Sequence, residues 1–230
     1  MKISSQNKKF AIIDGLLPDD QFERVWRHFQ TESYSIPHQS GWQKVWRLSD
    51  ANCMGGPSYS LAKKPFNNYM DAVSSYMLGA LKYAPDIAGV QGEDWVDATF
   101  RPYIYPRGTK LSWHNDGGNY HAALTYYVHP KWGSTWGGEL MAAETPDLES
   151  YQNKNKGQPH LDHRWEDEFL AEKGGGQFII PKPNRLVIMK AGVFHSINRV
   201  DADAGDNARC SIVSFLIKNK TCPVESNQCT

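Results

Sequence analysis

Neither sign of charge dominates this sequence. Lysine and arginine together number 25, and so do aspartate and glutamate, so the formal net charge is zero. A protein that binds nucleic acid through phosphate contacts needs a strongly positive surface, which this composition does not favour. We therefore expect no nucleic-acid partner.

Long apolar runs are also missing. No segment approaches the roughly 18–20 consecutive apolar residues that a membrane-spanning helix requires. The opening residues Met1-Lys2-Ile3-Ser4-Ser5 do not begin the apolar core of a signal peptide. These two absences predict a soluble, cytoplasmic protein with no membrane partner, and they leave the oligomeric state open.

Cysteine is scarce, and none of its occurrences forms a CxxC pair. The four residues are Cys53, Cys210, Cys222 and Cys229. In a reducing cytosol the expectation is free thiols, with a Cys222–Cys229 disulfide as the alternative. The sequence also lacks a phosphate-binding loop, because no Lys-Ser/Thr pair follows Gly174-Gly175-Gly176. We interpret these glycines as a hinge.

The length of 230 residues favours a single domain spanning 1–230. Residues 10–16 have the pattern of a short strand. A helix should follow Pro18-Asp19-Asp20, because Phe22, Val25, Trp26 and Phe29 share one helical face. The same spacing predicts a second helix between Pro65 and Pro85. We expect helices in about 1–96 to support the rest of the fold.

From Asp97 onward, β-branched and aromatic residues alternate with turn residues, which is typical of a β core. Eight short strands are predicted, and they suit a mainly β, double-stranded β-helix (a jelly roll, cupin-like) over about 97–218. The polar stretch 144–175 is predicted to be an insertion or lid. The predicted strands are 97–105, 109–114, 121–129, 137–143, 176–180, 185–190, 194–200 and 208–217.

Three residues have the spacing of a metal site. His114 and Asp116 are two positions apart, so on an extended segment both side chains would point to the same side. His195 begins a later predicted strand and supplies a third ligand. Two histidines and one carboxylate form the facial triad of non-haem Fe(II) oxygenases, which leaves three coordination positions open. The His-x-Asp pair alone is common by chance.

Arg209 strengthens this interpretation, because it follows His195 by fourteen residues and precedes Ser211 by two. A guanidinium group with a nearby hydroxyl group suits the far end of a buried dicarboxylate. Arg107 and Arg199 are alternative cations for this role. The triad and Arg209 together indicate an enzyme that binds a metal and an acidic co-substrate.

These motifs resemble the Fe(II)- and 2-oxoglutarate-dependent dioxygenases, most closely the prolyl 4-hydroxylase-like branch. The resemblance covers Tyr103 to Phe215, roughly half of the chain. Arg199 differs from the family, where proline is common, and the interval between His195 and Arg209 is longer than in many prolyl hydroxylases. The matching segments are Tyr105-Pro106-Arg107-Gly108, Leu124-Thr125-Tyr126-Tyr127-Val128, Gly137-Gly138-Glu139-Leu140, His195 to Val200, and Arg209 with Ser211.

The resemblance implies that His114, Asp116 and His195 are catalytic as the ligands of Fe(II). It also implies that 2-oxoglutarate is a co-substrate with O₂, that ascorbate assists turnover, and that the products include succinate and CO₂. The residues expected to bind 2-oxoglutarate are Arg209, Ser211, Tyr127 and Tyr105. Relatives that chlorinate carry Gly or Ala at the carboxylate position, so Asp116 resembles the hydroxylating members.

The substrate is less defined than the reaction. The leading hypothesis is hydroxylation of a small molecule such as an amino acid or a biosynthetic intermediate. A peptidyl, prolyl-type hydroxylase is the second hypothesis, and a non-catalytic cupin-like binding protein is the third. Four other histidines are interpreted as surface or packing residues, namely His121, His129, His160 and His163. Arg101, Tyr103 and Tyr105 alternate along one predicted strand, and the role of Arg101 stays open.

Overall fold

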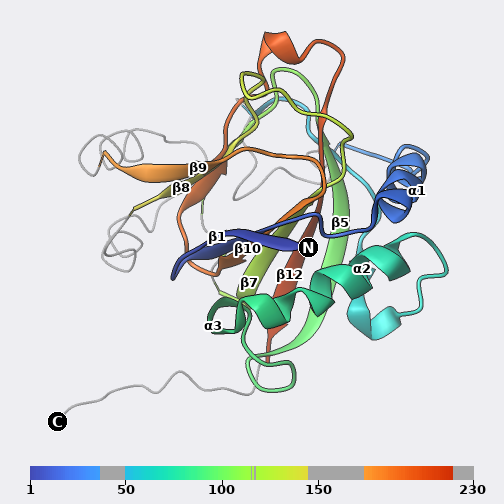
Figure 1. Ribbon diagram of the computed structural model, residues 1–230, viewed down its shortest axis with the longest axis vertical. Helices are drawn as coiled ribbons and strands as arrows, with labels where there is room; N and C mark the ends of the chain where they lie inside the picture. The colour runs from blue at the N-terminus through green and yellow to red at the C-terminus, as the bar shows by residue number, and fades with distance from the viewer. Residues whose placement is uncertain (37–49, 115, 117, 145–173, 220–230) are drawn as a thin grey trace.

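Two antiparallel β-sheets form the centre of the protein (Figure 1). The structure, a computed structural model, describes residues 1–36, 50–114, 116, 118–144 and 174–219. The larger sheet has the strand order β1 (Lys2–Gln6), β2 (Phe10–Asp14), β10 (Arg185–Lys190), β7 (Tyr120–Tyr127), β12 (Arg209–Lys218), β5 (Trp95–Tyr105) and β3 (Met54–Gly55), and β4 (Tyr59–Ser60) also pairs with β5. The smaller sheet has the order β6 (Leu111–His114), β11 (His195–Ile197), β8 (Leu140–Ala143) and β9 (Gly176–Ile179).

All eight predicted core strands are present, four in each sheet, and the arrangement is a double-stranded β-helix. The predicted fold class is therefore confirmed. Two strands, β8 and β11, are at least three residues shorter than predicted. β8 starts at Leu140 rather than 137, because Gly137 and Gly138 adopt positive φ angles of 70° and 71°, which extended strands do not use. β11 covers only His195–Ile197.

Helices cover the outer face of the larger sheet (Figure 1). They are α1 (Asp19–Phe29), α2 (Met70–Gly79) and α3 (Pro85–Ala88). Elsewhere in the described residues, 3₁₀ turns span Leu61–Lys63, Leu81–Tyr83 and Ala202–Ala204. Val25 and Phe29 of α1 pack in one buried cluster with Leu124 of β7 and Ile212 of β12. The predicted first helix and its buried face are thus confirmed.

The second helix departs from the prediction at both ends. It begins at Met70 because the carboxylate of Asp71 accepts hydrogen bonds from the backbone N–H groups of Phe66 and Asn67 at 3.0 and 2.7 Å, which holds these residues outside the helix. Pro85 does not close a helical segment but occupies the first turn of α3, where a missing N–H group costs nothing.

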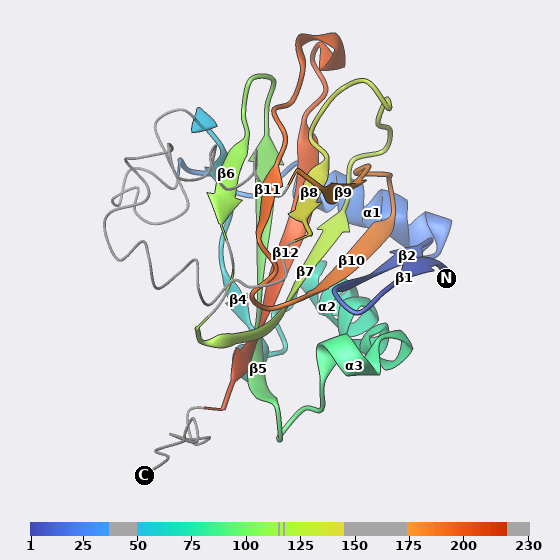
Figure 2. The same cartoon turned by 90° about the vertical axis from the view of Figure 1, so that its left-hand side faces the viewer.

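The N-terminal region is also less helical than predicted. β1 and β2 extend the larger sheet beyond β10, and β3 and β4 pair with β5 at the opposite side (Figure 2). The carboxylate of Asp14 on β2 accepts hydrogen bonds from Nε and Nη2 of Arg185 at 2.7 and 3.0 Å. Although burial favours the neutral acid, these hydrogen bonds hold the pKa of Asp14 well below its ordinary value.

Most of the predicted lid lies outside the described residues, which omit 145–173. Its two ends are joined, because Glu144 N–H donates to the Gly175 carbonyl group at 3.0 Å, next to the paired strands β8 and β9. The predicted glycine hinge is wrong at Gly176, which begins β9. A Cβ atom there would lie 2.7 Å from the carbonyl oxygen of Ala142.

Two of the four cysteines can be placed. Cys53 and Cys210 are buried free thiols, as expected, whereas Cys222 and Cys229 lie outside the described residues. Burial raises the pKa of each of the two described thiols to about 12. No helix in the part of the chain that the structure describes is long and apolar enough to span a membrane.

Strict alternation along the strands determines which side chains lie on the inner face of the larger sheet. On β12, Arg209, Ser211 and Val213 point toward the smaller sheet, because the intervening Cys210 and Ile212 pack in the outer cluster with the helices. Each inward residue has cross-strand neighbours. Arg209 pairs with Tyr105, Ser211 with Tyr103 and Tyr127, and Val213 with Arg101 and Thr125.

Candidate metal centre and co-substrate pocket

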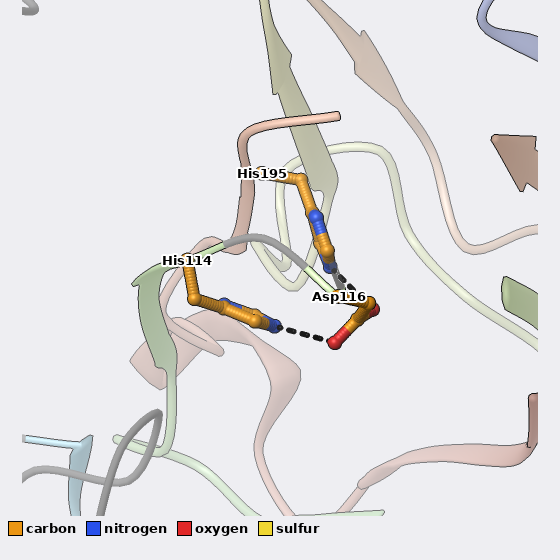
Figure 3. A group of neighbouring side chains, drawn as sticks. All are labelled: His114, Asp116 and His195. Carbon is orange, nitrogen blue, oxygen red and sulfur yellow. Dashed lines mark ion pairs between the residues drawn. The ribbon is translucent and has the colours of Figure 1, made fainter. Parts of the chain in front are cut away.

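The strand register brings the two candidate histidines together. His114 is the last residue of β6 and His195 the first of β11, and they are direct partners in the antiparallel pairing. Their ring centroids lie 4.2 Å apart. Both side chains point toward the same space between the sheets (Figure 3). Eighty-one residues of sequence separate them, so only the pairing of β6 with β11 creates this geometry.

Each histidine has one ring nitrogen engaged by its own strand. His114 Nδ1 lies 2.7 Å from the Ser112 carbonyl oxygen, and His195 Nδ1 lies 2.9 Å from the Val193 carbonyl oxygen. A carbonyl group can only accept, so each Nδ1 carries the proton and each Nε2 presents a lone pair. Such hydrogen bonds fix the tautomer and orientation of metal-binding histidines. No residue type in the sequence signals these two carbonyl groups.

Asp116 completes the group from an irregular segment. β6 ends at His114, where the predicted strand 109–114 also ends, and Asp116 lies two residues beyond it. The carboxylate nevertheless turns toward both rings, with Oδ1 3.7 Å from His114 Nε2 and Oδ2 3.3 Å from His195 Nε2 (Figure 3). Burial opposes ionisation of Asp116, but the electrostatic effect of the neighbouring His195 and His114 side chains outweighs it and lowers the pKa of the carboxyl group.

These three side chains fit a divalent transition metal. One ligand atom from each lies within 4.8 Å of the others, and within the described residues no other group of three or more His, Cys, Asp or Glu side chains meets this condition. Two imidazole nitrogens and one carboxylate oxygen are the donor set of the facial triad that holds non-haem Fe(II). The chemistry of the donors thus matches iron as well as the geometry does.

Arg209 is a fully buried guanidinium group on the inner face of β12. Its Nε donates to the Gly138 carbonyl group at 2.9 Å, while Nη1 and Nη2 lie 3.4 Å from the hydroxyl groups of Ser211 and Tyr127. The rings of Tyr105 and Tyr127 flank it, each with its centroid 5.0 Å from Cζ. The four residues expected at the co-substrate site are therefore brought together.

No carboxylate among the described residues forms an ion pair with Arg209. A buried charge is costly unless a partner of opposite sign or good hydrogen bonds compensate it. The surrounding tyrosine rings and long hydroxyl contacts compensate only part of that cost. The pocket therefore suits an anionic group from a bound molecule, such as the carboxylate of 2-oxoglutarate.

Gly138 is necessary to this pocket in a way that the sequence did not reveal. It adopts a φ of 71°, which side chains other than glycine rarely adopt. A Cβ atom at this position would lie 3.0 Å from Cδ of Arg209 and 3.1 Å from Cζ2 of Trp132. Glycine thus lets the backbone carbonyl group approach the guanidinium group closely.

The remaining candidate residues have structural roles, are exposed, or lie outside the described residues. His129 is buried, donates from Nε2 to the Pro181 carbonyl group at 2.5 Å and accepts at Nδ1 from Cys210 N–H at 3.1 Å. Burial lowers its pKa to about 4. Arg107 is exposed, and Arg199 is an exposed residue that donates to the Gly108 carbonyl group. Trp113 stacks on Phe194. His160, His163 and Asn115 lie outside the described residues.

Comparison with known sequences gives one family match. The model of the 2OG-Fe(II) oxygenase superfamily matches residues 100–217, which include all three candidate metal ligands and Arg209. Comparison with curated protein sequences gives no match.

Solved structures share the fold at low identity. A Pseudomonas putida prolyl-4-hydroxylase superposes with a TM-score of 0.63 at 14% identity, over 91% of this chain and 93% of that chain. A Trichoplax adhaerens prolyl hydroxylase, solved with a hypoxia inducible factor peptide, gives 0.57 at 15% identity over 92% and 84%. HygX from Streptomyces hygroscopicus, solved with nickel, 2-oxoglutarate and hygromycin B, gives 0.56 at 10% identity over 92% and 84%.

Proposed function

The chain belongs to the 2OG-Fe(II) oxygenase superfamily, and from this premise we propose that it hydroxylates a C–H bond of a small molecule. The observation that carries the proposal is that a complete triad and a buried arginine, which has no ion-pair partner among the described residues, lie between the same two sheets. A degenerate, non-catalytic cupin-like protein has no physical need for both.

The proposed metal ligands are His114, Asp116 and His195. Iron bound there, with 2-oxoglutarate and O₂, supplies the oxidising chemistry while 2-oxoglutarate is converted to succinate and CO₂. The protein's own contribution is positional. Backbone carbonyl groups of Ser112 and Val193 hold both Nε2 atoms toward the ion, and the Asp116 carboxylate balances part of its charge.

The proposed role of Arg209 is to bind the carboxylate of 2-oxoglutarate that is remote from the metal. Nε is already occupied by Gly138, which leaves both Nη atoms for the carboxylate. The hydroxyl groups of Ser211 and Tyr127, which lie beside those Nη atoms, can donate to the same group. Tyr105 packs against the guanidinium group and excludes water from it.

A small molecule is proposed as the substrate, and a peptide is the second candidate. HygX, which was solved with hygromycin B, supports a small-molecule substrate on this fold. The two prolyl hydroxylases, one of them solved with a peptide, support the second candidate. The position of Arg101 on β5 also supports a small-molecule substrate.

The direct test measures succinate formation by purified protein supplied with Fe(II), ascorbate, O₂ and 2-oxoglutarate. Amino acids, other metabolites and peptides are screened for compounds that stimulate it. Mass spectrometry should find one added oxygen atom in the stimulating compound. If neither 2-oxoglutarate nor a divalent metal binds the protein, the proposed function is wrong.

A further inference from the structure

A second arginine lies on the inner face of the larger sheet and is not used by the proposed co-substrate site. Arg101 of β5 is partly buried and pairs across the sheet with Val213 of β12. Tyr103 and Tyr105 follow it on the same face of β5, since alternate residues of a strand share a face. Arg101 therefore lies in the same interior as the Arg209 pocket.

The guanidinium group of Arg101 is held in place by neutral partners. Its Nε donates to the Gly56 carbonyl group at 2.9 Å, and its Cζ lies 5.3 Å from the ring centroid of Tyr103. Gly55 leaves room for it, because a Cβ atom there would lie only 2.9 Å from Nη2. Within the described part of the chain, no carboxylate forms an ion pair with Arg101. Its terminal nitrogens share one side-chain hydrogen bond with the neutral Tyr103, which leaves further donors for a ligand.

Arg101 is too far along the sheet to serve the same carboxylate as Arg209. Arg209 pairs with Tyr105, four residues from Arg101, and four residues of strand span about 13 Å. If Arg101 binds an anion, that anion must be a different one from the carboxylate that Arg209 is proposed to bind.

The metal triad lies between the two ends of this interior. Ile197, two residues after His195, packs in a cluster with Tyr105. Val193, two residues before His195, packs in the cluster that contains Tyr127 and Phe215. Val213, the cross-strand partner of Arg101, lies between Ser211 and Phe215 on β12. Because Ser211 pairs with Tyr127, Arg101 lies on the side of Tyr127 that is farther from Arg209.

We infer that Arg101 binds a carboxylate of the substrate, which makes the substrate a small carboxylic acid. This inference rests on the proposed function and narrows its substrate class. A guanidinium group fixed at Nε presents two parallel N–H donors, which a carboxylate accepts as a bidentate pair. Tyr103 beside it provides an aromatic surface for the apolar part of the same molecule. Free amino acids and other metabolic acids have this chemistry.

Three variants test the inference. Arg101→Gln removes the charge, Arg101→Lys keeps the charge without the planar fork, and Arg27→Gln removes a matched exposed charge from α1 on the outer side of the sheet. Each protein is loaded with Ni(II) and saturating 2-oxoglutarate. It is then titrated calorimetrically with 4-methylpentanoate, 3-phenylpropanoate and the primary amide of each.

The unaltered protein should bind the acids at least tenfold more tightly than the amides. Arg101→Gln should abolish this difference, Arg101→Lys should retain part of it, and Arg27→Gln should retain all of it. The Kd of 2-oxoglutarate should stay within twofold in every variant, because Arg209 is untouched. If the acids bind no more tightly than the amides, or bind Arg101→Gln as tightly as the parent, the inference is wrong.

Turnover gives an independent check. The compound that best stimulates succinate formation should carry a carboxylate, and Arg101→Gln should raise its KM at least tenfold with a smaller effect on kcat. A best substrate without any anionic group, whether peptide or metabolite, would overturn the inference. Failure of the unaltered protein to bind Ni(II) or 2-oxoglutarate would instead refute the proposed function, so the two failures are distinct.

Discussion

Replacing Arg209 by methionine should abolish most of the stabilisation that 2-oxoglutarate gives to the folded protein. Methionine fills a similar volume without a charge, and it removes the donors that face the hydroxyl groups of Ser211 and Tyr127. Truncating one partner of a buried, hydrogen-bonded charge pair costs about 2–5 kcal/mol. The lower limit corresponds to a roughly 30-fold increase in the Kd of 2-oxoglutarate.

The same change should leave the ligand-free protein at least as stable as the parent. Arg209 is fully buried and lacks a carboxylate partner among the described residues, so its charge is poorly compensated before a ligand binds. Replacing such a buried charge by an apolar side chain of similar size is often neutral or stabilising. The variant therefore separates a ligand-binding role from a structural one.

Chemical unfolding with Ni(II) present measures both effects. At a 2-oxoglutarate concentration 100 times the parent Kd, the parent gains about 2.7 kcal/mol of unfolding free energy. At that concentration a 30-fold weaker variant gains about 0.9 kcal/mol. Arg107→Met, which changes an exposed arginine, is the matched control and should behave as the parent does. If Arg209→Met gained the full 2.7 kcal/mol, the co-substrate carboxylate would bind elsewhere.

Three further perturbations test other parts of the site. Alanine at His114, Asp116 or His195 should abolish succinate formation and weaken Ni(II) binding without unfolding the protein, and an unchanged Ni(II) stoichiometry and affinity would remove that residue from the triad. Gly138→Ala should raise the KM for 2-oxoglutarate while leaving Ni(II) affinity unchanged, because its left-handed conformation costs roughly 1–2 kcal/mol and its Cβ would crowd Arg209; an unchanged KM would contradict this. His129 is buried with a pKa of about 4, below its unfolded value of about 6.5. The unfolding free energy should therefore fall by about 3 kcal/mol as the pH drops from about 6.5 toward 4. A His129→Gln variant with the same pH dependence over that interval would show that His129 does not cause it.

The eight core strands were predictable because their alternation is a local property of the sequence. Each inward residue of β12 is separated from the next by one residue that packs against the helices, and this pattern is visible without a structure. The ends of the elements were less predictable because they depend on single contacts. The start of α2 depends on the Asp71 carboxylate, and the start of β8 on the backbone conformation of Gly137 and Gly138.

The candidate metal ligands can be named from the sequence because their residue types and spacing are visible along the chain. His114 ends the predicted strand and Asp116 follows it by two positions, and the structure brings both side chains to the same point. The residue types were sufficient because few combinations of two histidines, one carboxylate and a later arginine serve other chemistry. The carbonyl groups of Ser112 and Val193, which orient the histidine rings, could not be predicted from the sequence because every residue has a backbone carbonyl group.

The two arginines on the inner face of the larger sheet, Arg209 and Arg101, show why the reaction class is easier to infer from sequence than the substrate. Arg209 belongs to a motif whose spacing from His195 can be read along the chain, and its proposed partner is the co-substrate that gives the family its name. Arg101 belongs to no such motif, and its orientation depends on Gly55 and Gly56 from a distant edge strand. The residue that we propose to bind the substrate is thus positioned by tertiary contacts between segments that are distant in sequence. The role of Arg101 can therefore be inferred only from the strand register and from the finding that no described carboxylate forms an ion pair with it.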